Sequence, residues 1–267
     1  GGIAGPITAM ALQRAGIEAT VHEAYARAAD GVGGMLGLAP NGLDALAAID
    51  LDGPVRDVAE PVSAMIVQSW TGKRLAQFDD PSGNPIMHVV WRPDLYRALY
   101  DEASRRGITI EHSHRFMEAH ESENGVTARF SDDSTARADI LIGADGSRST
   151  VRSMIDPSAP APRYTGLLGL GGLTTRADVD STNASYRMIF GKKAFFGYEV
   201  SDEGQISWFA NLPHRDPLTL AQAREVSPEE WLRVLGNAFA ADRIPAAAII
   251  AATAPADLMV IGGLELM

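Results

Sequence analysis

The sequence predicts an α/β protein with two domains, and three observations point to this class. Residues 1–23 contain a glycine-rich turn, a segment with helical apolar spacing over 6–15 and a strand-like alternation. A short apolar run at 138–142 leads into a second glycine turn. After the proline-rich segment 157–162, glycines and aromatic residues alternate with β-branched residues as far as Leu212. This change of composition indicates a second domain built on a mixed, largely antiparallel β-sheet.

The composition excludes several classes of protein. With 267 residues, of which 46% are hydrophobic, the chain has the makeup of a globular protein and not of a disordered one. Its net charge of −11 disfavours a nucleic-acid partner or an anionic membrane surface. No apolar run reaches the roughly 18 residues of a membrane span. Because the chain has no cysteine, it forms no disulfide or thiolate site, which fits a cytoplasmic location.

The spacing of hydrophobic residues and the positions of turn-forming residues predict the helices and strands of the first half of the chain. Gly16 is expected to end the first helix, and a strand over 17–23 follows. Pro93 suits the first turn of a helix that ends at Gly107. The remaining elements expected here are a loop over 28–42, a helix over 41–49 capped by Asn41, strands over 62–68 and 73–78 joined at Thr71-Gly72, a loop over 79–85, and strands over 108–112, 116–121, 126–130 and 138–142.

Two helices are expected towards the end of the chain. Ser227-Pro228-Glu229-Glu230 has the pattern of a capping box with proline at the first helical position, and it predicts a helix over 231–240. The alanine-rich segment 246–254 is also expected to be helical.

The first candidate site is the glycine turn together with Glu23. Glycines before a helix allow close approach of a pyrophosphate to the backbone, and the helix N-terminus favours its negative charge. Glu23 lies 21 residues after Gly2, near the spacing at which an acid binds the ribose hydroxyls of a dinucleotide. Taken alone, the turn could equally be a plain glycine-rich loop, and Glu23 a surface carboxylate.

The second candidate site is the segment from Asp139 to Arg152. A buried strand is expected to deliver Asp145 into the turn Gly143-Ala144-Asp145-Gly146, and Ser149 then begins a short helix. Asp-Gly is also common in ordinary turns, so a simple turn at a strand end is the alternative.

The two motifs and Trp91-Arg92-Pro93-Asp94-Leu95 occur in an order and at separations that resemble one family. The chain resembles the FAD-dependent class A aromatic hydroxylases, the p-hydroxybenzoate hydroxylase-like monooxygenases, over nearly its whole length. The pattern Gly-Ala-Asp-Gly-x-x-Ser-x-Val-Arg, beginning at Gly143, is the most specific part of the resemblance. The resemblance implies a Rossmann-like, GR2-type FAD-binding domain over 1–61, 86–157 and 257–267, and a substrate domain over 62–85 and 158–256.

The resemblance also implies roles for single residues. Gly2 and Gly5 would approach the FAD pyrophosphate, and Glu23 would bind the adenosine ribose. Arg92 would meet the pyrophosphate or the ribityl chain, although its alternative is a surface charge at a helix start. The remaining cofactor contacts are expected from the loop Gly33-Gly34-Met35-Leu36, with Gly34 and Leu36 beside the flavin ring, and from Asp145 and Gly146 between FAD and the nicotinamide.

The chemistry implied by the resemblance is hydroxylation of an aromatic, phenolic or polyketide-like small molecule. NADH or NADPH reduces FAD, O₂ gives a C4a-hydroperoxyflavin, and the protein supplies orientation and a dry pocket. No catalytic side chain and no metal site are predicted, and the oligomeric state is left open. A reductase or halogenase of the same fold, and a non-catalytic FAD-binding module, are the alternatives.

Two departures from the family are visible in the sequence. The Gly-Asp pair that contacts the ribityl chain is expected beyond Met267, and the start at Gly1 lies inside a motif, so the chain is read as a fragment. The charged residue that some tetracycline-degrading relatives carry beside the flavin is replaced by Gly37.

The substrate is expected on a hairpin formed by 194–200 and 206–212. Side chains alternate along a strand, so Phe196, Tyr198, Trp208 and Ala210 share a face if Tyr198 pairs with Trp208. This face is expected to line the substrate pocket next to the flavin. The alternative is that it only packs a core.

Overall fold

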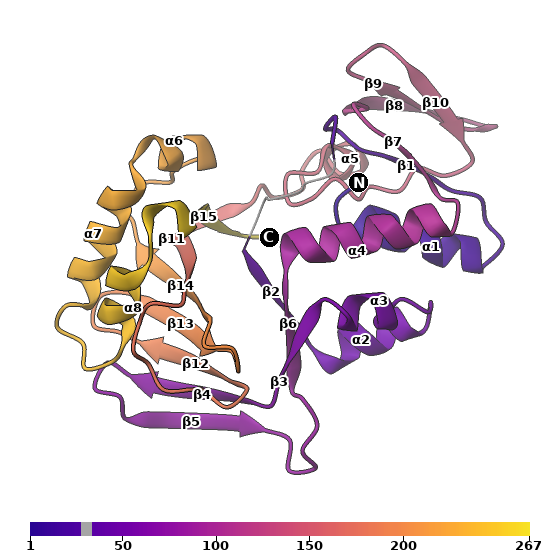
Figure 1. Ribbon diagram of the computed structural model, residues 1–267. Helices are drawn as coiled ribbons and strands as arrows, with labels where there is room; N and C mark the ends of the chain where they lie inside the picture. The colour runs from indigo at the N-terminus through magenta and orange to yellow at the C-terminus, as the bar shows by residue number, and fades with distance from the viewer. Residues whose placement is uncertain (28–33) are drawn as a thin grey trace.

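The computed structural model describes residues 1–27 and 34–267 (Figure 1). It is a mixed α/β structure, so the predicted fold class is confirmed. The helices are α1 (Ala4–Arg14), α2 (Pro40–Ala47), α3 (Asp52–Arg56), α4 (Arg92–Arg105), α5 (Thr150–Ile155), α6 (Leu220–Glu225), α7 (Pro228–Phe239) and α8 (Ala246–Ala252), with a short 3₁₀ turn at Pro255–Asp257.

The strands form four sheets. A seven-stranded sheet has the order β15-β11-β14-β13-β12-β4-β5, and the smaller sheets are β1-β7, β10-β9-β8 and β2-β6-β3. Their bounds are β1 (Thr20–His22), β2 (Met35–Leu38), β3 (Ala59–Val62), β4 (Ala64–Ser69), β5 (Arg74–Asp79), β6 (Met87–Trp91), β7 (Thr109–Glu111), β8 (Phe116–Ser122), β9 (Gly125–Phe130), β10 (Thr135–Ala138), β11 (Arg163–Thr174), β12 (Ser185–Phe190), β13 (Phe195–Val200), β14 (Ile206–Pro213) and β15 (Leu258–Leu266).

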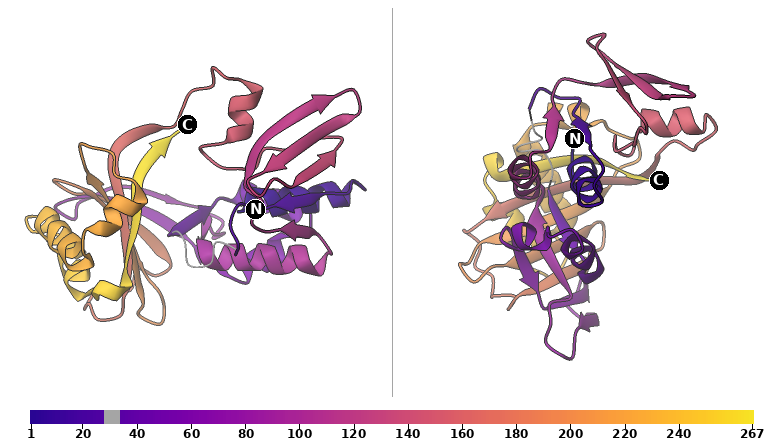
Figure 2. Two further views of the ribbon diagram at one scale, coloured as in Figure 1. Left: turned by 90° about the horizontal axis from the view of Figure 1, so that it is seen from above. Right: turned by 90° about the vertical axis from the view of Figure 1, so that its right-hand side faces the viewer.

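The molecule consists of two bodies that lie side by side. In the left view of Figure 2, the large sheet with α7 and α8 forms one side of the molecule, and the body with helices α1 and α4 forms the other side. In the first body β1 pairs in parallel with β7, and one hydrophobic core joins this pair to α1, α2 and α4. Met10, Leu43, Leu95 and Leu99 are fully buried in that core. The helical spacing predicted for 6–15 is therefore the spacing of a buried helix face.

The second body is the seven-stranded sheet covered on one face by α6, α7 and α8. The predicted hairpin register is confirmed, because Tyr198 pairs with Trp208 and Val200 pairs with Ile206. Trp208 stacks on Phe196 with ring centroids 5.7 Å apart, and its Nε1 donates a hydrogen bond of 3.0 Å to Thr253 Oγ1. These contacts place the shared face against the helices.

The face predicted to line the substrate pocket is therefore a core face. Phe196, Trp208 and Ala210 are fully buried and Tyr198 nearly so, and all four belong to the core that α7 and α8 complete. The alternation along the strands was predicted correctly, but only the position of the helices decides which face is covered. The opposite face of the hairpin is the one that faces the first body.

Three predicted elements differ in the structure. No strand forms at 138–142: β10 ends at Ala138, and the side chains of Ile140 and Ile142 are exposed. No described strand pairs with this segment, so its backbone has no ladder partner. The helix expected to be capped by Asn41 begins at Pro40, with Ala39 as its N-cap. The loop expected over 28–42 contains β2, which pairs with β6, and residues 28–33 of that loop lie outside the described part of the chain.

The end of the chain joins the second body. The segment 257–267 was assigned to the first domain, but β15 pairs with β11 at the edge of the seven-stranded sheet. Strand β11 pairs with β14 along one edge and with β15 along the other, so backbone pairing decides this placement. The other domain bounds remain a prediction.

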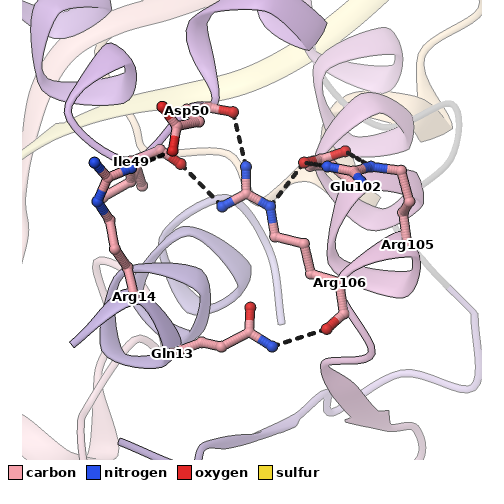
Figure 3. A network of polar contacts seen from close by, with 7 residues as sticks. All are labelled: Gln13, Arg14, Ile49, Asp50, Glu102, Arg105 and Arg106. Carbon is pink, nitrogen blue, oxygen red and sulfur yellow. Dashed lines mark hydrogen bonds and ion pairs between the residues drawn. The ribbon is translucent and has the colours of Figure 1, made fainter. Parts of the chain in front are cut away.

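A network of polar contacts fixes the end of α4 to its neighbours (Figure 3). Glu102 is buried and accepts hydrogen bonds from Arg105 and from Nε of Arg106, the latter at 2.7 Å. Arg106 also donates to the carbonyl oxygens of Ile49 and Asp50, at 2.9 and 2.7 Å. Hydrogen bonds from Arg105 and Arg106 lower the pKa of Glu102 to about 2. The network therefore ties α4 to the segment between α2 and α3.

We expect Glu102→Gln to lower the free energy of unfolding by about 2 kcal/mol at pH 7, because two charged hydrogen-bond donors lose their anionic partner. The pKa of Glu102 is lowered by folding, so its contribution is complete above pH 4.5 and is lost as the pH falls towards 2. Urea unfolding across this range measures it. Asp101→Asn, at an exposed neighbour, is the control, and an equal loss in both variants would contradict the assignment.

Candidate cofactor site and the adjoining cavity

The glycine turn at 1–5 leads into the N-terminus of α1. No side chain caps this helix, and Ile3 occupies its N-cap position. A Cβ atom added to Gly5 would lie 3.3 Å from Cγ1 of Val21, so this glycine lets α1 approach β1 closely. The first N–H groups of α1 are free of side-chain acceptors, and such a terminus binds anions.

Glu23 lies beside this turn, directly after β1. It is only 8% exposed, and its Oε1 accepts a hydrogen bond of 2.9 Å from the backbone N–H of Tyr25. Its Oε2 is 3.1 Å from the amino nitrogen of Gly1. The structure thus brings together the glycine turn and the acid that the spacing singled out. The carboxylate has capacity for further hydrogen bonds, which the hydroxyls of a ribose would use.

One face of α4 lines the same place. Arg92, Tyr96 and Tyr100 are four residues apart and therefore project from the same side of the helix. Nη2 of Arg92 donates to Oη of Tyr96 at 2.9 Å, and Oη of Tyr100 donates to the carbonyl oxygen of Gly1 at 2.8 Å. A Cβ atom on Gly2 would lie 3.6 Å from the ring of Tyr96. The helix face and the glycine turn are in contact.

Arg92 carries an unpaired group at the centre of this arrangement. Its Nε is buried and has no hydrogen-bond partner among the described residues. A buried guanidinium N–H without an acceptor costs free energy, and a phosphate oxygen would satisfy it. The glycine cradle, the uncapped α1 and the orphaned Nε therefore fit a dinucleotide pyrophosphate.

Gly34 connects this site to the second body. Its carbonyl oxygen accepts a hydrogen bond of 3.1 Å from the backbone N–H of Arg92. A Cβ atom on Gly34 would lie 3.3 Å from Cδ1 of Ile261 in β15, so the two bodies approach each other here. Leu36 pairs with Val90 and packs against the first core. Gly33 lies outside the described residues.

Asp145 has a structural task at the start of α5. Its carboxylate accepts hydrogen bonds from Oγ of Ser149 and from the backbone N–H groups of Thr150 and Val151. Although burial opposes ionisation, these hydrogen bonds lower the pKa of Asp145. The preceding residue, Ala144, is next to Gly5, since a Cβ atom added to Gly5 would lie 4.0 Å from the Cβ atom of Ala144. The second motif therefore reaches the glycine turn through Ala144.

Gly146 follows Asp145 with a φ of 85°, a backbone conformation that favours glycine. Any contact of Asp145 or Gly146 with FAD or nicotinamide remains a prediction.

A cavity adjoins the cofactor site, between the β2-β6-β3 sheet and the second body. The space that a water molecule can occupy in it is about 40 Å³, and the empty space is about 410 Å³ when the part open to solvent is counted. Its lining residues are Met35, Val58, Glu60, Val89, Trp91, Glu199, Ser201, Gln205 and Ser207. Glu199 and Ser207 come from the hairpin face opposite Trp208. The cavity is thus built from the side of the sheet that the sequence prediction did not select.

Glu199 is a buried acid at this cavity. The residue is 5% exposed. Burial, reinforced by the charges of Glu60 and Asp202, raises the pKa of Glu199 to about 7. Burial also raises the pKa of the nearby Tyr186 hydroxyl. Perturbed acids in a cleft are a feature of functional sites.

Several of these residues were missed by sequence reasoning. Tyr96 and Tyr100 could have been found from their four-residue spacing after Arg92. Glu60 and Glu199 lie far apart in the sequence, and neither belongs to a motif. Only the packing of two sheets brings them to one cavity.

Comparison with known proteins identifies the family. A family model described as "FAD binding domain" matches residues 1–254. The chain belongs to this family. The matched residues include the glycine turn, Glu23 and the Asp145 segment, and the resemblance to the class A flavin hydroxylases is confirmed.

Individual relatives of this FAD-binding chain are hydroxylases by name. It is 27% identical over 262 residues to the FAD-dependent urate hydroxylase of Klebsiella pneumoniae, covering 95% of the chain and 65% of the relative. It is 35% identical over 173 residues to the 3-amino-4-hydroxybenzoate 2-monooxygenase PtnB3 of Streptomyces platensis, covering 62% of the chain and 42% of the relative. The chain thus spans less than two thirds of these relatives' lengths.

Solved structures share the fold. The Klebsiella pneumoniae HpxO structure complexed with FAD and uric acid superposes with a TM-score of 0.82 at 24% identity, over 99% of the chain and 66% of HpxO. The 2,6-dihydroxypyridine-3-hydroxylase of Arthrobacter nicotinovorans gives a TM-score of 0.74 at 17% identity, over 99% of the chain and 70% of that enzyme.

The described residues contain neither a metal-binding cluster nor a membrane-spanning helix. Residues 1–27 and 34–267 contain no group of three acidic, histidine or cysteine side chains arranged to hold a metal ion. Within the same ranges, no helix is long and apolar enough to cross a membrane.

We expect Glu23→Gln to weaken FAD binding about tenfold or more, because a charge-assisted hydrogen bond to the ribose is worth roughly 1.5–3 kcal/mol. Fluorescence titration of the apoprotein with FAD measures this change. Glu18→Gln removes an exposed carboxylate just before β1 and should leave the affinity unchanged. Equal affinity of wild type and Glu23→Gln would remove Glu23 from the site.

We expect Arg92→Gln to reduce the FAD retained through purification, since the variant lacks the cation for the pyrophosphate. The ratio of flavin absorbance to protein absorbance measures retention. Arg97→Gln, on the exposed face of the same helix, is the matched control. Full retention by Arg92→Gln would show that the orphaned Nε does not meet the cofactor.

Proposed function

We propose that this protein is an FAD-dependent monooxygenase that is reduced by NADH or NADPH and hydroxylates an aromatic small molecule. The observation that carries the proposal is the position of the cavity. It adjoins the end of β6, where Trp91 lines it and the next residue, Arg92, faces the cofactor site. The family match and the hydroxylase names of its relatives support this function.

Each part of the cofactor site has a task in this function. Glu23 would bind the ribose hydroxyls, the free N–H groups of α1 would bind the pyrophosphate, and Nε of Arg92 would donate to a phosphate oxygen. Gly34 and Leu36 lie on the segment that leads from Arg92 towards the second body. Bound FAD would supply hydride acceptance from the nicotinamide and activation of O₂ for transfer of one oxygen atom to the substrate.

The cavity would orient the substrate and exclude water. Met35, Val89 and Trp91 offer an apolar wall on the FAD side, and Ser207 and Glu199 offer polar groups on the opposite side. Exclusion of water protects a reactive oxygen donor from loss as hydrogen peroxide. The substrate is proposed only as a class of compound, an aromatic small molecule. Urate and aminohydroxybenzoates, the compounds in the relatives' names, are among those to test. A cytoplasmic location remains a prediction.

We expect the purified protein to show a flavin spectrum and to oxidise NADH or NADPH faster when a suitable hydroxyaromatic compound is present. The starting panel contains 2,6-dihydroxypyridine and 4-hydroxybenzylamine, with urate and 3-amino-4-hydroxybenzoate as anionic comparisons. Mass spectrometry after reaction under isotopically labelled O₂ should find one labelled oxygen atom in the product. A tightly bound flavin that NADH and NADPH do not reduce would favour a non-catalytic module, and reduction without oxygen insertion would favour a reductase.

A further inference from the structure

The cavity between the two bodies is acidic. Two of its lining residues, Glu60 on β3 and Glu199 on β13, are carboxylic acids, and none of the lining residues is lysine, arginine or histidine. The other polar groups, from Ser201, Gln205 and Ser207, are neutral. A ligand that carries a carboxylate would therefore meet like charge without a compensating cation.

Glu199 is aimed into this cavity without a partner. The residue is only 5% exposed, no described residue forms a hydrogen bond with its carboxylate, and the carboxylate oxygens are accessible from the cavity. Its charged neighbours are Glu60 on β3 and Asp202 in the hairpin loop, and both disfavour its ionised form. The titratable Tyr186 on β12 also lies close to it. The Glu199 carboxyl therefore lacks a hydrogen-bond donor, and an O–H or N–H group of a ligand can supply one.

Two basic groups on the strands around the cavity, His88 and Arg187, belong to other surfaces. His88 alternates with Val89 along β6, so it projects to the opposite face, where Arg56 lies 3.4 Å from it. Arg187 pairs with Tyr198 on the face of the large sheet away from Glu199. The strand alternation therefore keeps these cations out of the cavity.

We propose that Glu199 is the polar anchor of the ligand and sets its charge. Glu199 accepts a hydrogen bond from an O–H or N–H group of a neutral or positively charged aromatic compound, and Glu199 with Glu60 excludes aromatic carboxylates. The proposal rests on the proposed function only because it takes this cavity as the substrate site. The expected preference for neutral or cationic ligands distinguishes this protein from relatives whose names contain anionic compounds.

The test compares three phenols of one shape that differ in charge. They are 4-hydroxybenzylamine, 4-hydroxybenzamide and 4-hydroxybenzoate, and calorimetry at pH 8 measures their dissociation constants with the FAD-loaded protein. We expect the amine to bind the wild type about tenfold or more tightly than the benzoate, with the amide between them. In Glu199→Gln, which keeps the shape of the side chain, this preference should fall to about threefold or less.

Two further variants make the result specific. Glu203→Gln removes an exposed carboxylate from the same hairpin loop and should keep the full preference. Glu60→Gln, at an exposed lining position, should reduce the preference by a smaller factor than Glu199→Gln. It tests the proposal if Glu199→Gln does not fold.

The pH dependence adds a signature that a structural role would not produce. Neither the amine nor the benzoate changes its ionisation between pH 6 and 8. Because the pKa of Glu199 is about 7, the carboxylate is mostly neutral at pH 6, so the wild-type preference should shrink there. Glu199→Gln should show a flatter dependence.

The proposal is overturned if the wild type binds none of the three compounds, if it prefers the benzoate, or if Glu199→Gln keeps the preference. These binding results do not depend on turnover. A protein that shows the charge preference but does not oxidise NADH or NADPH would contradict the proposed function and support the anchor.

Discussion

The direct passage of strand β3 into strand β4 fixes the two bodies of this protein relative to each other. Strand β3 pairs with β6 in the first body, and β4 begins only one residue later and pairs in parallel with β12 in the second. The residue between them, Ser63, donates its N–H to the carbonyl oxygen of Ala184 at 2.8 Å. Val62 is fully buried beside Val89 and Tyr186. With no linker between the two ladders, the walls of the cavity have a defined separation.

The alternation of side chains along a β-strand then decides which side chains of the large sheet line the cavity. Helices α7 and α8 cover the face of the large sheet that carries Trp208 and Phe196, so every second residue is committed to that core. Glu199 lies between Tyr198 and Val200, both in the core, and is therefore directed to the opposite face. Packing of its neighbours offsets the cost of burying its carboxyl, and this explains how an acid without a partner persists there.

Helix α4 relates the cofactor site to the rest of the first body. Its apolar face, with Leu95 and Leu99, belongs to the core, which sets the rotation of the helix. Its face with Arg92 and Tyr96 is thereby turned to the glycine turn. At the other end, the contacts of Glu102 with Arg105 and Arg106 hold the helix along its axis (Figure 3). Positioning of the orphaned Arg92 Nε thus depends on contacts more than two turns away.

The sequence by itself determined the fold class and the family, and it singled out Glu23 and Arg92 at the candidate cofactor site. Local signals carry this information. They are Gly2 and Gly5 at the start of a helix, Glu23 at the end of a strand, Pro93 at the start of α4, and the alternation that set the register of Tyr198 against Trp208. Each depends on backbone geometry or on side-chain spacing within one element or one hairpin. Such signals are readable from neighbouring residues.

Only the tertiary structure decided which sheet face is core and which lines the cavity. The alternation of 194–200 is the same in both cases, and helices far along the chain choose between them. The same holds for 138–142, whose apolar pattern is that of a strand although no described strand pairs with it. Glu60 and Glu199 are separated by more than half the chain and meet only because β3 leads directly into β4. Long-range packing has no local signature, since it depends on which surfaces the whole chain buries together.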